Sequence, residues 1–208
     1  MNIQPMTKAG AEEIAHWAYD PPYDFYNMEG ESAIIELLEE NYYEVRDREG
    51  DVIGFFCLGP AGRVPHDDMA DLYTDTRFTD IGIGMRPNRT GQGAGTAFFQ
   101  TILSYCERRL DIVDFRLAVA SFNERAIHLY EKLGFEKVGS FDKSHSTGFT
   151  NFQIMIRDLG RRADQERSQK QWLWFLVVIV LFAIAGWIFK DIIDFSLFAS
   201  GLLTGVNL

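Results

Sequence analysis

A glycine-rich stretch between two apolar runs is the first place in the sequence where residue types and spacing suggest chemistry. Glycines stand at alternate positions, Gly91, Gly93 and Gly95, after the apolar run 80–85 and before a helical pattern that begins at Ala97. Glycine lets backbone N–H groups converge at a helix N-terminus, which suits an anion such as a pyrophosphate. Neither a Walker Gly-Lys-Ser/Thr nor a G-x-G-x-x-G spacing is present, so a phosphate-binding turn of another kind is predicted. Taken alone, a flexible turn is the alternative.

A second segment, from Asn123 through Tyr130 to Gly134 and Phe135, carries further polar side chains in a fixed order. Together the two segments resemble the GNAT superfamily of acetyl-CoA-dependent N-acetyltransferases. The first is similar to the family's Q/R-x-x-G-x-G/A motif, with Thr90 at the usual Gln/Arg position, and the second to its N-x-x-A-x-x-x-Y-x-x-x-G-F segment. The pair of motifs is more specific than either motif alone.

The resemblance implies a co-substrate, acetyl-CoA, and the residues that bind it. The backbone of the strand from Ile83 to Met85 would pair with the pantetheine, and the loop from Thr90 to Thr96 would hold the pyrophosphate. The full set of implied cofactor-binding residues is Ile83, Met85, Thr90, Gly91, Gln92, Gly93, Ala94, Gly95, Thr96 and Asn123.

Tyr130 matches the tyrosine that protonates the leaving sulfur in the family. A phenol is protonated at neutral pH and can donate, which suits that task. Without the resemblance, a tyrosine that only packs in the core would be the expected interpretation.

The group that removes the proton from the amine is less clearly marked. Asp80 lies on the strand that leads into the glycine stretch, and strand alternation places it on the same side as Gly82 and Gly84. We expect it to act as the base directly or through water, with a solvated acid at a strand end as the alternative. The acidic segment 66–75 could suggest a metal, but an exposed acidic loop explains it better, so no metal is predicted.

The segment 17–27 is unusually aromatic for a loop that follows a helix. In this superfamily the region after the first helix forms a wall for the acceptor, which makes Trp17, Tyr23 and Tyr26 the predicted substrate-binding residues. Aromatic packing beneath a loop is an equal alternative.

The elements that position these residues alternate in type along the first 160 residues. Hydrophobic periodicity and turn residues predict helices at 7–17, 31–40, 97–106 and 124–133, and strands at 42–48, 52–58, 80–85, 115–120, 135–138 and 150–156. The resemblance implies an α/β (α+β) fold with a mixed, mostly antiparallel sheet, a splayed central strand pair and about four helices. We expect this acetyltransferase domain to cover residues 1–159.

An uncharged apolar run follows the domain. Residues 172–189 contain no charge, and as a helix they would reach about 27 Å, close to the ~30 Å hydrocarbon core of a bilayer. We therefore predict a basic linker at 160–171, a transmembrane helix at 172–190 and a short apolar tail at 191–208, the last as an interfacial stretch rather than a second span. A buried core helix is the alternative for the span.

Charge and composition set the compartment and exclude some partners. The opening residues contain no apolar run, so we expect no signal peptide and a single-pass membrane protein whose N-terminal domain lies in the cytoplasm. A formal net charge of -10 disfavours nucleic acid as a partner. Cys57 and Cys106 are far apart in sequence, which argues against a disulfide scaffold and a structural zinc site.

These observations predict a membrane-anchored N-acetyltransferase that transfers an acetyl group to a primary amine by direct attack. The acceptor would be a small amine or a protein N-terminus, and the sequence does not choose between them because acceptor pockets are built from variable loops. The alternative function is a non-catalytic, membrane-anchored acyl-CoA-binding regulatory module.

Overall fold

The computed structural model describes residues 1–39, 41–65, 73–145, 148–160 and 165–179. The chain divides into two units, Met1–Leu159 and Gly160–Leu208. All residues predicted to form the site belong to the first unit.

A seven-stranded mixed sheet forms the centre of the first unit, with the strand order β1-β2-β3-β4-β5-β7-β6 in the part of the chain that is described. The strands are β1 (Asn2–Pro5), β2 (Tyr42–Arg46), β3 (Val52–Leu58), β4 (Thr79–Met85), β5 (Phe115–Ala120), β6 (Glu136–His145) and β7 (Gly148–Arg157). Every neighbouring pair is antiparallel except β4 and β5, which are parallel. The predicted mixed, mostly antiparallel sheet is confirmed.

The helices follow the predicted order. They are α1 (Lys8–Ile14), α2 (Gly30–Leu37), α4 (Gly95–Arg109) and α5 (Glu124–Lys132), with short 3-10 turns η1 (Tyr23–Tyr26), η2 (Gly59–Gly62) and η3 (Pro87–Arg89). The Thr7 side chain caps α1, as its sequence position suggests, because its Oγ1 accepts a hydrogen bond from the Gly10 N–H at 3.1 Å. Both α1 and α2 end before their predicted limits, and the four-residue strand β1 was not predicted because it is too short to show alternation.

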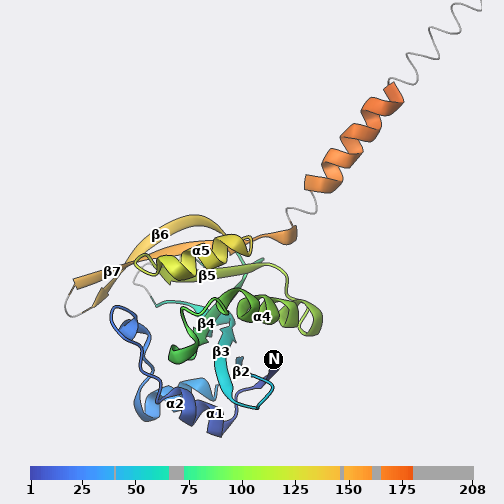
Figure 1. The fold of residues 1–208 in the computed structure, drawn as a ribbon. Helices are drawn as coiled ribbons and strands as arrows, with labels where there is room; N and C mark the ends of the chain where they lie inside the picture. Colours follow the sequence, from blue (N-terminus) through green and yellow to red (C-terminus); the bar gives the residue numbers. More distant parts are fainter. Residues whose placement is uncertain (40, 66–72, 146–147, 161–164, 180–208) are drawn as a thin grey trace, which may run out of the picture. The chain divides into compact units, whose positions relative to one another are not determined.

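The helices cover opposite faces of the sheet. Side chains of α4 and α5 pack with Phe56, whereas side chains of α1 and α2 pack with Cys57. Because successive residues of a strand point to opposite faces, these two neighbours on β3 show that the helix pairs lie on different sides (Figure 1). A site that opens through the sheet can therefore draw side chains from both pairs.

The sheet opens at its centre, between β4 and β5. These strands pair only at Thr79 with Phe115 and at Asp80 with Arg116, so they diverge after Asp80. The predicted splayed central pair is present in the structure. On its other side, β4 stays paired with β3 from Ile81 to Met85.

The free edge of β4 presents backbone groups to this gap. The Arg86 N–H donates to the Ile53 carbonyl at 2.9 Å, which fixes the phase of the ladder between β3 and β4. In an antiparallel ladder, alternate residues turn their N–H and C=O groups away from the partner strand. Ile81, Ile83 and Met85 are those residues of β4, so their backbone polar groups face the gap.

In the second unit, residues 165–179 form a helix. Among the described residues, no helix is both long enough and apolar enough to cross a membrane. Residues 180–190 of the predicted span and the predicted tail at 191–208 lie outside the described residues.

Candidate active site

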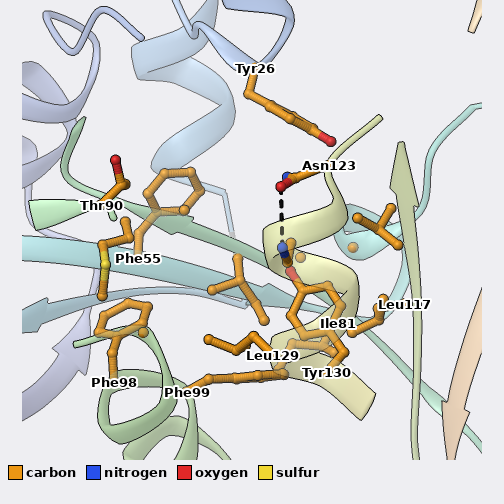
Figure 2. A pocket seen from close by; sticks show the side chains of 18 of the residues that line it. Tyr26, Phe55, Ile81, Thr90, Phe98, Phe99, Leu117, Asn123, Leu129 and Tyr130 are labelled. Carbon is orange, nitrogen blue, oxygen red and sulfur yellow. Dashed lines mark hydrogen bonds between the residues drawn. The ribbon is translucent and has the colours of Figure 1, made fainter. Parts of the chain in front are cut away.

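A pocket of about 660 Å³ occupies the gap between β4 and β5 and extends to both faces of the sheet (Figure 2). Most of the predicted site residues line it, namely Tyr23, Tyr26, Ile83, Met85, Thr90, Gly91, Gly93, Gly95, Thr96, Asn123 and Tyr130. The lining does not include four others, Trp17, Asp80, Gln92 and Ala94. The two sequence motifs thus meet in one cavity.

The glycine stretch forms a cradle at the start of α4. Gly91 and Gly93 have φ values of 73° and 80°, which residues other than glycine rarely adopt. A Cβ added at Gly93 would meet no atom within 4 Å, so the backbone there faces open space. The N-cap residue Ala94 makes no side-chain cap hydrogen bond, which leaves the first N–H groups of this 15-residue helix without a side-chain cap. This arrangement fits a pyrophosphate.

The positive charge nearest to the cradle comes from Arg125 on α5. Thr90, at the motif's usual Gln/Arg position, donates its hydroxyl to the Pro87 carbonyl at 2.8 Å, and Arg89 pairs with Asp47 at 3.3 Å. A Cβ added at Gly91 would instead lie 3.2 Å from Nη1 of Arg125.

Arg125 lines the pocket, and its guanidinium lies over the Tyr23 ring, 4.4 Å from the ring centroid. Neither sequence motif marks Arg125 as a site residue. The signal that could have found it is its place in the first turn of α5, two residues after Asn123.

Tyr130 lies on the α5 side of the pocket. Its ring packs edge-on against Phe99, with the centroids 5.4 Å apart, and lies 5.9 Å from the ring of Phe135. Burial raises the pKa of Tyr130 well above its usual range, and the nearby Tyr26 adds to the effect. The hydroxyl therefore keeps its proton at every pH at which the protein would work, which is the state that a proton donor needs.

Asn123 and the aromatic residues connect the pocket wall to β5. The Oδ1 of Asn123 accepts a hydrogen bond from the Ala126 N–H at 3.2 Å and so caps α5 (Figure 2). The Tyr26 hydroxyl accepts a hydrogen bond from the Ala120 N–H at 3.3 Å. Tyr23 and Tyr26 thus line the pocket, and their role in binding the acceptor stays a prediction.

Trp17 does not stand in that wall. It is 8% exposed and packs against Phe55, with the ring centroids 6.2 Å apart, because α1 ends at Ile14 and turns the indole into the core between α1, α2 and β3. Tyr19, which was not among the predicted site residues, does line the pocket. The Tyr19 hydroxyl donates to the Met85 carbonyl at 2.8 Å, so this carbonyl on the free edge of β4 is already engaged.

Asp80 is enclosed by two arginines rather than open to a substrate. Its carboxylate is 2% exposed and accepts hydrogen bonds from Nε of Arg116 at 2.6 Å, Nη2 of Arg116 at 3.0 Å and Nε of Arg63 at 2.7 Å. It is also missing from the pocket lining. This geometry argues against the predicted role of Asp80 as the base. Its hydrogen bonds to Arg116 instead connect β4 to β5.

The described residues contain no group of three or more His, Cys, Asp or Glu side chains that could hold a metal ion. Residues 66–72, which make up most of the acidic segment considered above, lie outside the described residues. Cys57 and Cys106 are both buried and free.

Residues 11–135 match the family model described as the acetyltransferase (GNAT) family, and the chain belongs to this family. The family uses acetyl-CoA as co-substrate, which the glycine cradle and the free edge of β4 fit. The protein is thus an acetyl-CoA-dependent N-acetyltransferase, as the two motifs predicted. No curated protein matches the chain.

Solved structures share the fold at low identity. A chimera of the spermidine N-acetyltransferase SpeG from Vibrio cholerae and hSSAT aligns with a TM-score of 0.56 and 20% identity, over 74% of this chain and 93% of that chain. A GNAT-family acetyltransferase from Bacillus anthracis aligns with a TM-score of 0.55 and 15% identity, over 74% of this chain and 92% of that chain. At these identities the likeness establishes the fold.

The substitution Asp80→Asn tests whether the Asp80 carboxylate stabilises the fold or acts as the general base. Removing one partner of a buried ion pair costs about 3–5 kcal/mol, so we expect a loss of that order in the free energy of unfolding, measured by urea titration. Asp75→Asn is the matched control, because Asp75 forms an exposed pair with Arg77 and should leave the urea midpoint unchanged. An Asp80→Asn protein with normal stability and no turnover would instead support the base.

Gly93→Val tests the cradle. Its side chain would enter the open space beside the backbone N–H groups, so we expect acetyl-CoA binding to be largely lost in calorimetry. Gly50→Val is the control for backbone strain, because Gly50 also has a positive φ, of 94°, and open surroundings but lies outside the pocket. Unchanged affinity in a folded Gly93→Val protein would mean that the pyrophosphate binds elsewhere.

Proposed function

We propose that this protein transfers the acetyl group of acetyl-CoA to a primary amine by direct attack, at the point where β4 and β5 diverge. The observation that carries the proposal is that one pocket joins the glycine cradle, the free backbone edge of β4 and the Tyr130 hydroxyl. Acetyl-CoA supplies the thioester when it is bound there. The residues of the chain would hold it, orient it and supply the proton for the departing sulfur.

Each part of the pocket has a distinct task in this proposal. The backbone of Gly91 to Thr96 and the guanidinium of Arg125 would bind the pyrophosphate. The outward-facing backbone groups of Ile83 would pair with the pantetheine, whereas the Met85 carbonyl is held by Tyr19. Tyr130 would donate its proton to the leaving thiolate.

The aromatic wall supports an amine acceptor with an apolar body. Tyr19, Tyr23 and Tyr26 line the part of the pocket on the α1 and α2 side, together with Phe55 and Met28. Aromatic faces attract cations as well as apolar groups, so this wall suits a small amine or a protein N-terminus. The spermidine activity named for the Vibrio cholerae structures agrees with an amine of this kind.

We further propose that the C-terminal segment anchors the enzyme in a membrane, with the catalytic unit in the cytoplasm. The helix at 165–179 supports this, because it carries seven exposed large apolar side chains: Trp172, Leu173, Trp174, Phe175, Leu176, Val177 and Ile179. The uncharged run continues in the sequence to Phe189, and basic residues precede it. An apolar run with a basic flank on the cytoplasmic side is typical of a membrane anchor.

Tyr130→Phe tests whether the enzyme uses this phenol as an acid. The substitution keeps the ring and removes one oxygen, so we expect kcat to fall at least about tenfold while acetyl-CoA affinity stays nearly the same. Tyr105→Phe is the control, since Tyr105 packs on α4 outside the pocket lining. An unchanged rate and pH profile would remove Tyr130 from the mechanism, and a wild-type protein that binds acetyl-CoA without turning over any amine would support the binding-module alternative.

Ending the chain after Gly160 tests the anchor. Because Met1–Leu159 is a compact unit that contains the whole pocket, we expect the truncated chain to be soluble and to bind acetyl-CoA normally. The full-length chain should sediment with membranes. A tag at its C-terminus should be protected from protease in sealed vesicles whose cytoplasmic face points outward. Full-length protein in the soluble fraction, or truncated protein that still sediments with membranes, would contradict the anchor.

A further inference from the structure

A row of groups crosses the floor of the pocket on the α1 and α2 side and has no part in the chemistry described so far. Tyr42 on β2 lies directly opposite Cys57 on β3, and Cys57 lies directly opposite Gly82 on β4. Residues opposite one another share a face of the sheet, so the Tyr42 and Cys57 side chains point to the same side. Both line the pocket, and each is 4% exposed.

The inner end of this row lies at the gap between β4 and β5. A Cβ added at Gly82 would sit 2.7 Å from Sγ of Cys57, so the thiol lies against the strand where an acceptor must approach. The Cys57 Sγ–H donates to the Ala61 carbonyl at 3.3 Å, and burial raises the pKa of Cys57 to about 11, so the thiol is uncharged. Cys57 therefore fills the space between Gly82 and Tyr42 without adding a charge.

The outer end of the row is Glu36 on α2. The Tyr42 hydroxyl donates to Oε1 of Glu36 at 2.8 Å, and Glu36 itself is exposed at the surface of α2. Among the described residues that line the pocket, Glu36 is the one acid. The hydrogen bond from Tyr42 thus connects the buried part of the pocket to a carboxylate that is open to solvent.

The other titratable groups considered around this pair are either uncharged or paired with an arginine. From β3 the facing titratable group is Cys57, and α1 contributes apolar residues such as Ile14 to the same cluster. Two buried carboxylates are held by arginines: Asp80 by Arg63 and Arg116, and Glu44, two residues from Tyr42 on β2, by Arg46. The base that direct attack requires must be found elsewhere in the pocket lining.

We infer that Tyr42 and Glu36 form a proton relay that deprotonates the acceptor ammonium before it attacks. The N–H bond of the ammonium breaks and its proton binds the Tyr42 oxygen, while the Tyr42 O–H bond breaks and its proton binds the Glu36 carboxylate. The electron pair left on nitrogen is then free to attack the thioester carbon. This inference rests on the proposed acetyl transfer and specifies that the acceptor enters as a cationic alkylamine.

The environment of Tyr42 suits a group that passes a proton on and does not hold a charge. Burial raises the pKa of Tyr42 well above its usual range, and the neighbouring Cys57 and Glu36 raise it further. A phenolate at this position is therefore disfavoured, so the two proton transfers must be concerted. Glu36 can then release its proton to solvent, because it is exposed.

The relay is tested with two acceptors that differ mainly in the charge of their amine. Ethylamine is an ammonium at neutral pH, whereas trifluoroethylamine is mostly neutral and needs no proton acceptor before attack. We expect Glu36→Gln and Tyr42→Phe each to lower kcat/KM for ethylamine by about tenfold or more, and to leave kcat/KM for trifluoroethylamine within about twofold. The Kd of acetyl-CoA, measured by calorimetry, should not change in either variant.

Glu31→Gln is the matched control, because Glu31 is an exposed acid on the same helix that does not line the pocket, and it should leave both acceptors unaffected. Equal losses for both acceptors in Glu36→Gln would overturn the relay in favour of a structural role, and no loss for ethylamine would overturn it by showing that the proton leaves by another route. A wild-type protein that acetylates neither amine, nor any other, would overturn the proposed function and the relay with it.

Discussion

The buried contact between Asp80 and Arg116 sits where the parallel ladder of β4 and β5 ends, and the pocket exists because that ladder ends there. The two strands share only two residue pairs, and the last pair is Asp80 with Arg116. The guanidinium of Arg116 also donates to the Asp75 carbonyl at 3.2 Å, and Arg63, the residue after η2, donates to the Asp80 carboxylate. Charges buried this deeply are tolerated only when their hydrogen bonds are satisfied, as they are here. Beyond this point the strands separate and expose the edge of β4.

The gap opened in this way receives opposite charges from the two faces of the sheet. On one side, α5 places Arg125 and Lys132 along the pocket, at a spacing that puts them on one face of the helix. On the other side, α2 contributes Glu36. A pocket with a cationic end and an acidic end suits a reaction in which an anionic cofactor meets a cationic acceptor, because each substrate is attracted to a different end.

Two buried tyrosines illustrate how contacts decide the task of a side chain when the environment is similar. Burial raises the pKa of both Tyr130 and Tyr42, so both are phenols and neither is a phenolate. Tyr42 has a carboxylate as its hydrogen-bond acceptor, which gives a proton a path out of the pocket. Tyr130 is surrounded by the rings of Phe99 and Phe135, so its proton is available to a ligand. In the proposed mechanism one tyrosine therefore removes a proton while the other supplies one.

Local patterns along the chain are enough to predict the two motifs, the family and the order of the helices and strands after β1. Glycines with positive φ at 91 and 93, the cap at Asn123 and the apolar periodicity of α4 all act within a few residues of one another. Tertiary structure decided the partners of Asp80, since Arg63 and Arg116 lie 17 and 36 residues away and no local pattern links them. It also decided that Trp17 is a core residue, that Arg125 stands at the cradle beside Gly91, and that Glu36 meets Tyr42. In each case the role depends on which side chains meet across elements, and that meeting is set by packing of the helices on the sheet, where spacing along the chain carries no information.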